Sequence, residues 1–457
     1  MITLDFKYGT LLLRGDRETL EGVPGSCVYD ERVECWRAEA CDYAAIVMHL
    51  HRGGIPYEDG ARAYDTLGLE LDSELSPRDY QAEAVAAWFA ADRRGVIALP
   101  TGSGKSFVAR MAIARTDRST LVVVPTLDLM EQWSTQLARA FGTEIGLLGG
   151  GSKEVRPITV STYDSAVLMM EFLGNRFGLL IADECHHLPG AVNQTLARMC
   201  IAPFRLGLSA TPDRDDGADT VLYDLMGAIC YRKDIDELEG KVLAPYRTRR
   251  LELELEPDEA EAYERNRAVY VDFVRANGIR FSSPGGWAQF LCLCARHPQG
   301  REAFDAYLAQ KRIARTSRAK FAKIWELFRE HAGERILIFT ADNLTAYEIG
   351  RRFLLPVLTH HTKMKERKAF LDGFRAGAYP VLATSKVLNE GVDVPEASVG
   401  VVVSGSGSVR EHVQRLGRIL RPVKGKQAVL YELVSLGTSE SYTSERRRQH
   451  RAYQRSS

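Results

Sequence analysis

The residues best suited to chemistry lie in the loop Leu99-Pro-Thr-Gly-Ser-Gly-Lys-Ser106. The apolar run 95–99 is typical of a buried strand, and the apolar residues of 107–115 suit a helix. Between a strand and a helix, a Gly-Lys-Ser ending predicts phosphate binding, because inward-facing backbone N–H groups and the helix N-terminus both attract anions. The loop therefore predicts a nucleotide site built on a P-loop.

Two side chains of this loop have separate expected roles. Lys105 is expected to reach the β- and γ-phosphates, and the Ser106 hydroxyl is expected to hold Mg²⁺. The other residues that we expect to surround the phosphates are Thr101, Gly102, Ser103 and Gly104. The strict P-loop pattern has Gly where this chain has Leu99, so the loop alone is a moderately specific signal.

A pair of carboxylates, Asp183 and Glu184, follows the apolar run 179–182. A P-loop enzyme needs an acidic residue near the loop's Ser to hold Mg²⁺, and a group that orients the attacking water. Asp183 suits the first task and Glu184 the second. Adjacent acids at a strand end are common by themselves, but downstream of a P-loop they predict a hydrolytic site.

A third group of residues lies in 412–421, His-Val-Gln-Arg-Leu-Gly-Arg-Ile-Leu-Arg. If this stretch is a helix, Gln414, Arg418 and Arg421 share one face. A P-loop ATPase needs cations that reach the γ-phosphate as charge spreads in the transition state. We therefore predict that Arg418 and Arg421 act as catalytic fingers, against the alternative of ordinary solvated surface arginines.

The elements that must position these groups alternate between strands and helices. Ser76 is predicted to cap a helix whose first position is Pro77. Strands are expected at 96–99, 120–124, 157–160, 179–182 and 206–209, and a second block has strands at 335–339, 381–383, 399–403 and 428–431. Apolar strands at such intervals predict parallel sheets with helices on both faces and ligands at the carboxyl ends of the strands.

Four regions follow from this pattern. We expect a small α+β domain over 1–75, a first α/β domain over 76–240, a second over 241–437, and a basic tail over 438–457. The first region has short strands at 8–14 and 27–29 and a helix over 42–51, and it suits a substrate-contacting module or a plain scaffold. The second α/β domain contains an alternating strand at 251–256 and a helical, basic insertion at about 257–325.

Composition narrows the class of protein. Lys plus Arg and Asp plus Glu both number 60, so net charge identifies no partner in this chain of 457 residues. No apolar run suits a membrane span and the start lacks a signal-peptide pattern, so we expect a cytoplasmic protein, or a nuclear one in a eukaryote. The eight cysteines form no C-x-x-C pair, which favours reduced thiols over a zinc site.

The motifs together resemble superfamily 2 helicases and translocases over about 76–437. The resemblance places Arg78 and Gln81 in the adenine-reading segment. It places Thr126, with Gln132-Trp133, and Thr162 in motifs that contact the strand, and Ser209 and Thr211 in the coupling motif. It assigns Thr384, Gly391, Asp393 and Gln414 to motifs of the second motor domain. The implied fold is two tandem doubly wound RecA-like domains.

Within this superfamily, the chain is most similar to the XPB (Rad25) group, and to its short archaeal-type members. The similarity is strongest in 404–408 and 414–426. The group's R-E-D signature matches Arg214, Asp215 and Asp216, with Asp215 in place of Glu and hence a shorter reach. The resemblance also implies that 1–75 is a damage-recognition-like domain and that the basic helical insertion is a thumb.

The resemblance implies an ATP- and Mg²⁺-dependent DNA helicase with 3′-to-5′ polarity, acting in nucleotide excision repair or transcription-linked repair. The expected partners are single-stranded DNA and duplex junctions, with a nuclease as an expected protein partner and a monomeric chain. Two alternatives remain open, namely a duplex translocase or an ATP-driven clamp, and a lesion binder in which ATP only sets conformation. The cations within 296–323 are expected to grip the duplex, against the alternative of a solvated helical face.

Overall fold

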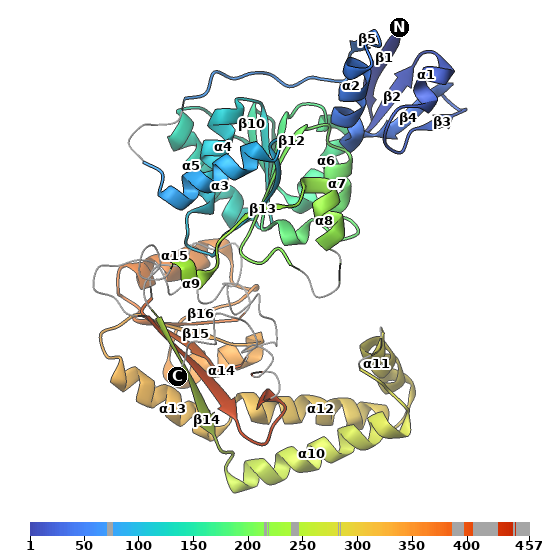
Figure 1. Cartoon of the computed structure of the whole chain (residues 1–457). Coiled ribbons are helices and arrows are strands. Elements are labelled where there is room, and N and C mark those ends of the chain that lie inside the picture. The colour runs from blue at the N-terminus through green and yellow to red at the C-terminus, as the bar shows by residue number, and fades with distance from the viewer. Residues whose placement is uncertain are drawn as a thin grey trace. The chain divides into compact units, whose positions relative to one another are not determined.

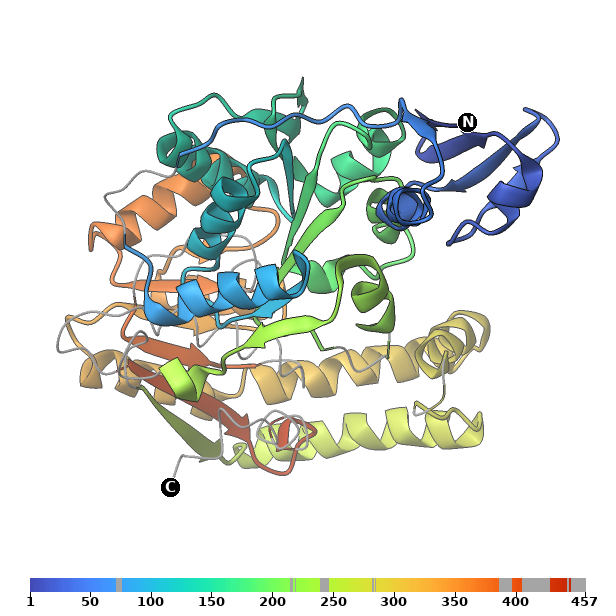
Figure 2. The same cartoon turned by 45° about the horizontal axis from the view of Figure 1, so that its top comes forward.

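The computed structural model describes residues 1–70, 76–213, 217, 219–238, 246–281, 283, 285–385, 397–404, 428–441 and 444. These residues divide into two compact units, the first ending at Leu238 and the second holding the described residues from Tyr246 onward. Figures 1 and 2 show the elements of both units along the chain. Each unit is described by itself.

The first unit begins with a small α+β domain. Its sheet has the strand order β3-β4-β2-β1-β5, and only the β1–β5 pair is parallel. The strands are β1 (Ile2–Lys7), β2 (Thr10–Arg14), β3 (Val28–Asp30), β4 (Cys35–Glu39) and β5 (Tyr57–Asp59). The helices are α1 (Arg17–Glu21), η1 (Ala40–Asp42) and α2 (Tyr43–Arg52). Leu4, Leu11 and Leu13 are fully buried against Ile46 and Leu50 of α2.

The strand predicted at 8–14 begins two residues later, at Thr10. Tyr8 and Gly9 instead form the turn between β1 and β2, and both have positive φ angles, 48° and 74°. A left-handed pair of residues closes a two-residue hairpin, because this backbone twist matches that of the flanking strands.

The first α/β domain has an eight-stranded sheet in the order β13-β6-β12-β11-β7-β10-β8-β9. All pairs are parallel except β8–β9. The strands are β6 (Arg94–Ala98), β7 (Thr120–Val124), β8 (Gly146–Gly149), β9 (Ser152–Glu154), β10 (Ile158–Thr162), β11 (Leu179–Asp183), β12 (Phe204–Ser209) and β13 (Ile229–Arg232). The five strands predicted here are therefore confirmed to within a few residues.

Helices cover both faces of this sheet. They are α3 (Asp79–Ala90), α4 (Lys105–Thr116), α5 (Leu127–Phe141), α6 (Tyr163–Leu173), η2 (Cys185–His187), α7 (Gln194–Arg198), α8 (Asp219–Met226) and α9 (Ile235–Leu238). In Figure 1, α3, α4 and α5 lie on one side of the sheet and α6, α7 and α8 on the other, and within each group neighbouring helices are in contact. This is the predicted doubly wound α/β fold.

Helix α3 begins later than predicted. The predicted cap Ser76 and first position Pro77 both precede the helix, which begins at Asp79 with Arg78 as its N-cap. The Gln81 side chain accepts a hydrogen bond from the Arg78 N–H at 3.0 Å, and this bond satisfies a backbone donor at the helix start. Gln81 thereby sets the boundary that Ser76 was expected to set.

The segment after β5 runs along the first α/β domain and is bonded to it. Asn175 Nδ2 donates to Ala61 O at 2.9 Å, and the Ser119 N–H donates to Asp65 O at 3.0 Å. Further along, the Leu69 N–H donates to Asp117 Oδ1 at 2.9 Å. The segment that follows the small domain is therefore held to the first α/β domain by main-chain and side-chain hydrogen bonds within one unit.

The second unit is built on a six-stranded, all-parallel sheet in the order β14-β19-β18-β15-β17-β16. Its strands are β14 (Tyr246–Leu253), β15 (Ile336–Phe339), β16 (Val357–Leu358), β17 (Val381–Thr384), β18 (Val399–Val402) and β19 (Ala428–Ser435). The helices described beside this sheet are α13 (Arg318–Glu330), α14 (Asn343–Phe353) and α15 (Met364–Arg375). The predicted second doubly wound domain is thus present.

Three helices of this unit precede α13 and share a core of their own. They are α10 (Pro257–Ala276), α11 (Gly286–Arg296) and α12 (Gly300–Arg315), and Phe273 and Phe290 are buried among them. In contrast, Phe321 and Ile324 of α13 pack against the parallel strands. The helical insertion predicted to reach about residue 325 therefore includes the first half of a helix that belongs to the sheet's own core.

Candidate nucleotide site

The P-loop joins the carboxyl end of β6 to the first turn of α4. Gly102 and Gly104 have φ angles of 86° and 85°, in the left-handed region that favours glycine. A Cβ at Gly104 would lie 2.6 Å from Gln81 Nε2, so a larger residue there would displace the Gln81 amide. Lys105 begins α4, and its Nζ donates to Leu99 O at 3.2 Å. The loop thus has the backbone geometry expected of a phosphate cradle.

The N-terminus of α3 holds the loop in this shape. Gln81 Nε2 donates to Ser103 O at 3.1 Å, and the Tyr80 hydroxyl donates to the same carbonyl oxygen. Ser103 itself is fully buried and its hydroxyl donates to Pro100 O at 2.7 Å. Gln81, predicted to read adenine, therefore contacts the P-loop directly, and Arg78 lies at the same helix start.

The two carboxylates lie at the end of β11, on the same edge of the sheet as the P-loop. Strand β12 lies between β6 and β11, and the Leu99 N–H donates to Ser209 O at 3.0 Å. Asp183 is 7 % exposed and Glu184 9 % exposed. The sheet therefore brings Lys105, Asp183 and Glu184 to one edge, as the sequence predicted.

The electrostatics of Asp183 reflect this crowding. Burial raises the pKa of the Asp183 carboxyl, and the neighbouring charge of Glu184 raises it further. The Lys105 ammonium and the Trp133 indole oppose both effects. A divalent cation beside Asp183 would favour the ionised form in the same way as Lys105, because each places positive charge next to the carboxylate.

Ser209 and His186 connect the carboxylates to β12. The buried His186 ring places Nδ1 3.1 Å from Ser209 Oγ and 3.6 Å from Glu184 Oε2. Ser209 Oγ in turn accepts a hydrogen bond from the Thr211 N–H at 3.1 Å. The two residues predicted as a coupling motif thus contact the acidic motif through a histidine for which the sequence suggested no separate role.

Three buried oxygen atoms at this edge have no hydrogen-bond partner among the described residues: Thr101 Oγ1, Glu184 Oε2 and Thr211 Oγ1. Leaving a buried polar atom without a partner costs about 1–3 kcal/mol. Such atoms gather where a polar ligand supplies the missing contacts. A magnesium nucleotide with its bound waters fits these donors and acceptors, together with the Ser106 hydroxyl at the start of α4.

Several predicted residues lie elsewhere. Thr126 and Thr162 cap the N-termini of α5 and α6, where their side chains accept hydrogen bonds from the Leu129 and Ser165 N–H groups. Thr384 ends β17 in the second unit, and its hydroxyl donates to Ser385 O at 3.1 Å. The predicted residues outside the described part of the chain are Arg214, Asp215, Asp216, Gly391, Asp393, Gln414, Arg418 and Arg421.

Trp133, which the resemblance places with Thr126 in a strand-contacting motif, has its side chain inside the domain. Its side chain is 3 % exposed, and the indole Nε1 donates to Asp183 Oδ2 at 2.8 Å. The sequence did not indicate the contact between Trp133 and Asp183. The two residues come close only because β7, which precedes the helix of Trp133, lies next to β11, which ends at Asp183. Trp133 is therefore a residue of the nucleotide site whose contact with Asp183 the sequence did not indicate.

Family comparisons match most of the chain in three parts. Residues 4–61 match the Xeroderma pigmentosum group B helicase damage recognition domain, and 301–455 match the ERCC3/RAD25/XPB C-terminal helicase. Residues 74–214 match the res subunit of type III restriction enzymes. The DNA 3′-5′ translocase XPB2 of Sulfurisphaera tokodaii is 39% identical over 422 residues, covering 92% of this chain and 95% of that protein.

The chain belongs to the XPB (Rad25) helicase family. The DNA 3′-5′ helicase XPB of Mycobacterium tuberculosis is 30% identical over 470 residues, covering 96% of this chain and 77% of that protein. This confirms the resemblance inferred from the motifs.

Solved structures support the fold. The Pyrococcus furiosus Hef helicase domain matches with a TM-score of 0.53 and 18% identity, over 82% of this chain and 98% of that one. Dbp5 of S. cerevisiae, solved with RNA and ADP BeF3, matches with a TM-score of 0.57 and 16% identity, over 82% of this chain and 87% of that one. At these identities the likeness concerns the fold alone, and it agrees with the predicted tandem RecA-like domains.

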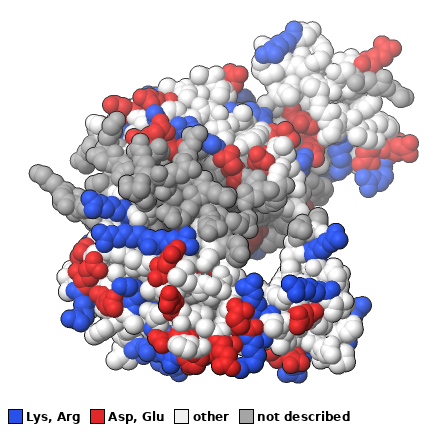
Figure 3. Space-filling view, turned by 60° about the horizontal axis from the view of Figure 1, so that its bottom comes forward, with Lys and Arg blue, Asp and Glu red and all other residues white. Residues whose placement is uncertain are grey.

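The basic block of the second unit is more neutral than its sequence indicates. Its ion pairs among the described residues include Arg315–Asp342, Arg318–Asp258, Arg318–Glu259, Lys320–Glu440 and Lys323–Glu326. Lys320 is fully buried and also donates to Val403 O at 2.6 Å, so the expectation that it faces DNA is wrong. Figure 3 shows Lys and Arg interspersed with Asp and Glu over the described part of its face. Arg296, Arg301 and Arg312 remain exposed.

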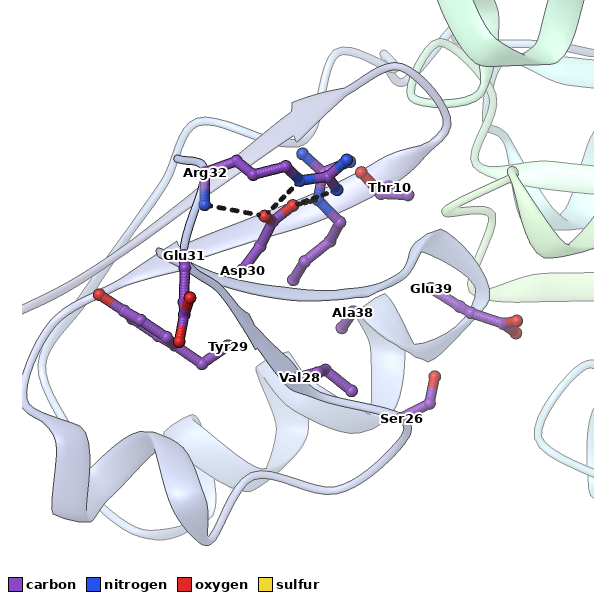
Figure 4. Close-up of a pocket in the computed structure, with 10 residues that line it drawn as sticks. Thr10, Ser26, Val28, Tyr29, Asp30, Glu31, Arg32, Ala38 and Glu39 are labelled. Carbon is purple, nitrogen blue, oxygen red and sulfur yellow. Dashed lines mark hydrogen bonds and ion pairs between the residues drawn. The ribbon is translucent and has the colours of Figure 1, made fainter. Parts of the chain in front are cut away.

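A hollow of about 550 Å³ lies on the small α+β domain, beside β3 and β4. Asp30 lines this hollow beside Arg32, as Figure 4 shows. Arg32 Nε lies 2.9 Å from Asp30 Oδ1, and Arg37 Nε lies 3.4 Å from Asp30 Oδ2. The hydrogen bond from Arg32 lowers the pKa of Asp30. Both arginines thus have an acidic partner, and the hollow is no part of the nucleotide site.

Two further observations concern membrane-spanning helices and metal-binding clusters. Within the described ranges, no helix is both long and apolar enough to span a bilayer. All eight cysteines are free thiols, and the described residues contain no cluster of three or more His, Cys, Asp or Glu that could hold a metal ion.

Proposed function

We propose that this protein is an ATP-dependent DNA motor that translocates 3′ to 5′ and opens DNA strands in repair or transcription-linked repair. The observation that carries the proposal is the convergence of Lys105, Asp183 and Glu184 at one sheet edge, where three buried oxygens have no hydrogen-bond partner among the described residues. Membership in the XPB family supports DNA as the polymer. The relatives named above carry the descriptions DNA 3′-5′ translocase and DNA 3′-5′ helicase.

In the proposed reaction, backbone N–H groups of Gly102, Gly104 and their neighbours bind the nucleotide phosphates. Lys105 neutralises charge on the terminal phosphates, and Asp183 and Ser106 hold Mg²⁺. Mg²⁺ held by these two residues would offset the negative charge that develops on the phosphates in the transition state. Glu184 orients the attacking water.

Residues from the carboxyl-terminal part complete this scheme. We assign the finger role to Arg418 and Arg421 and the nucleotide contacts to Gly391, Asp393 and Gln414, on the resemblance of their motifs alone. An arginine finger raises the rate of hydrolysis by a factor of about 10³–10⁵. DNA contacts are assigned in the same way to Thr126, Thr162 and Thr384, and strand separation to Arg214, Asp215 and Asp216. We also propose that the chain acts as a monomer with a nuclease partner, in the compartment that holds the genome.

The test compares ATP turnover with single-stranded DNA, duplex DNA, bubble DNA and single-stranded RNA, measured in parallel. We expect DNA to raise turnover above that of the free enzyme, because the proposed motor couples strand binding to the nucleotide site. Lys105→Ala, which removes the phosphate-contacting ammonium, is the control for contaminating ATPases. If none of the four nucleic acids changes the rate of ATP turnover, the proposal is contradicted. That result would favour a lesion-binding protein in which ATP only sets the conformation.

The first relative's description as a translocase favours a second candidate, a motor that moves along duplex DNA without processive unwinding. Displacement of a triplex-forming oligonucleotide from intact duplex measures translocation, and release of a strand from a tailed duplex measures unwinding. Triplex displacement without strand release would select the translocase. Release from a 3′-tailed but not a 5′-tailed duplex would select the 3′-to-5′ helicase.

A further inference from the structure

Asp183 is held by two aromatic side chains from different helices. The Trp133 indole of α5 donates to the carboxylate oxygen Oδ2 at 2.8 Å. The Tyr163 hydroxyl, from the first residue of α6, donates to the main-chain oxygen of Asp183 at 3.0 Å. Both aromatic residues are 3 % exposed. The remaining carboxylate oxygen, Oδ1, accepts the Glu184 N–H at 3.0 Å.

These two helices start at the residues proposed to contact the polynucleotide. Thr126 is the N-cap of α5 and Thr162 is the N-cap of α6. Strands β7 and β10, which lead into the two helices, are neighbours in the sheet, and β7 also pairs with β11, which ends at Asp183. The helices lie on opposite sides of this sheet in Figure 1. Asp183 is therefore bonded to the first residue of α6 and to the middle of α5.

We propose that Trp133 and Tyr163 are positioning residues that transmit polynucleotide contact at the starts of α5 and α6 to the metal-binding carboxylate of Asp183. This inference rests on the proposed function. A shift of either helix on binding a strand moves a hydrogen-bond donor of Asp183, because packed helices move as rigid elements. A change in the position of Asp183 alters how well the site holds Mg²⁺·nucleotide. By linkage, the nucleotide then changes DNA affinity by the same factor.

The chain contains a matched comparison for Trp133. Trp88 of α3 is fully buried in the same domain, and its indole Nε1 donates to Arg205 O at 2.9 Å. Both tryptophans therefore bury an indole and satisfy one donor. Only Trp133 bonds to a residue of the nucleotide site. Trp88→Phe shows how much the loss of any buried indole hydrogen bond changes the coupling between DNA and nucleotide binding. A larger change in Trp133→Phe is then the part specific to the bond with Asp183.

The experiment measures the affinity of a fluorescent ADP analogue for the full chain, with Mg²⁺ or with EDTA, in the absence and presence of a saturating DNA oligonucleotide. The ratio of the two affinities is the coupling factor, expected at about 5–150 in the wild type with Mg²⁺. Trp133→Phe and Tyr163→Phe should each lower this factor at least about threefold, and the double variant should bring it close to 1. With EDTA, analogue affinity should change less than about twofold in both variants.

Several outcomes decide the matter. A normal coupling factor in Trp133→Phe and Tyr163→Phe would overturn the inference, and so would an equal loss in Trp88→Phe. If Trp133→Phe fails to fold by circular dichroism, Tyr163→Phe decides, since it removes a single oxygen atom. If DNA does not change the affinity of the wild-type protein for the Mg²⁺·ADP analogue, the proposed function is overturned as well. If DNA changes that affinity in the wild type and also in the variants, only the role of Trp133 and Tyr163 is overturned.

Discussion

Glu184 combines two unfavourable features at one position. Its φ and ψ angles of 46° and 52° lie in the left-handed region, which a non-glycine residue seldom occupies. Its Oε2 atom is buried and has no hydrogen-bond partner among the described residues. Backbone strain of this kind costs about 1–3 kcal/mol and persists where the surrounding structure imposes it, most often at functional sites. Glu184 is therefore held in place by its neighbours in spite of its own conformational preference.

We predict that Glu184→Gln lowers ATP hydrolysis by about 10²–10⁴, the usual contribution of a positioned acid–base group. Nucleotide affinity should stay within about twofold, because Lys105 and the loop N–H groups that bind phosphate are unchanged. Stability should stay the same or rise by up to about 1 kcal/mol, because the amide places no charge in the buried site. Steady-state turnover, equilibrium nucleotide binding and urea unfolding measure the three effects. Hydrolysis at the wild-type rate would remove Glu184 from the catalytic assignment.

At the scale of elements, one buried arginine joins β12 to the two helices beside it. Arg205 is fully buried and its guanidinium donates to main-chain oxygens of Ala202, Leu225, Ala197 and Cys200, at 3.1, 2.9, 3.0 and 2.7 Å. These carbonyl groups belong to the ends of α7 and α8 and to the segment that enters β12. Buried charge is tolerated only where its donors are satisfied, and here carbonyl dipoles do this.

We predict that Arg205→Met destabilises the first unit by about 2–4 kcal/mol, because the hydrogen bonds from its guanidinium to four main-chain oxygens are lost. Hydrogen exchange read by mass spectrometry should show faster exchange in α7 and α8, with α13 of the second unit unchanged. The control is Arg198→Met, which removes a half-exposed ion pair to Glu39 of 2.8 Å and should cost less than about 1 kcal/mol. Equal effects of the two variants would contradict the structural role of Arg205.

At the scale of the whole molecule, the two units have separate cores and distribute their cysteines unequally. Burial raises the pKa of the Cys41 thiol to about 12 and that of Cys230 to about 11, both in the first unit. Cys185 and Cys200 are fully buried there. In the second unit, Cys292 is exposed on α11. Because the thiolate is the reactive form, a raised pKa and burial both slow modification.

We predict that Cys292 reacts first with iodoacetamide at pH 8, at least about tenfold faster than Cys41. At this pH on the order of 1 in 10⁴ of the Cys41 thiols is ionised, given a pKa raised to about 12. The reaction of Cys41 should accelerate as the pH rises towards that value. Peptide mass spectrometry over time locates the labels, and Cys292→Ser should remove the fast phase. Early labelling of Cys41 would show that its burial is overestimated.

The sequence alone determined the features that depend on short spacings. The P-loop is recognisable because its characteristic residues lie close together in the sequence, between a strand and a helix. They are Gly102, Gly104, Lys105 and Ser106. The strands β7 and β11 were predicted closely because buried parallel strands are continuous apolar runs. The rule that ligands lie at the carboxyl ends of such strands then brought Asp183 to the loop without any knowledge of strand order.

The tertiary structure alone decided the contacts between residues distant in the chain. Trp133 looked like part of a strand-contacting motif, and only the pairing of β7 with β11 shows that its indole bonds to Asp183. Lys320 looked like one cation of a basic surface, yet it is buried beside Glu440. Such contacts depend on strand order and helix packing, which many sequences with the same local pattern do not share. Local sequence patterns thus predict the helices, the strands and the nucleotide-binding loop. Tertiary packing determines which side chains contact one another.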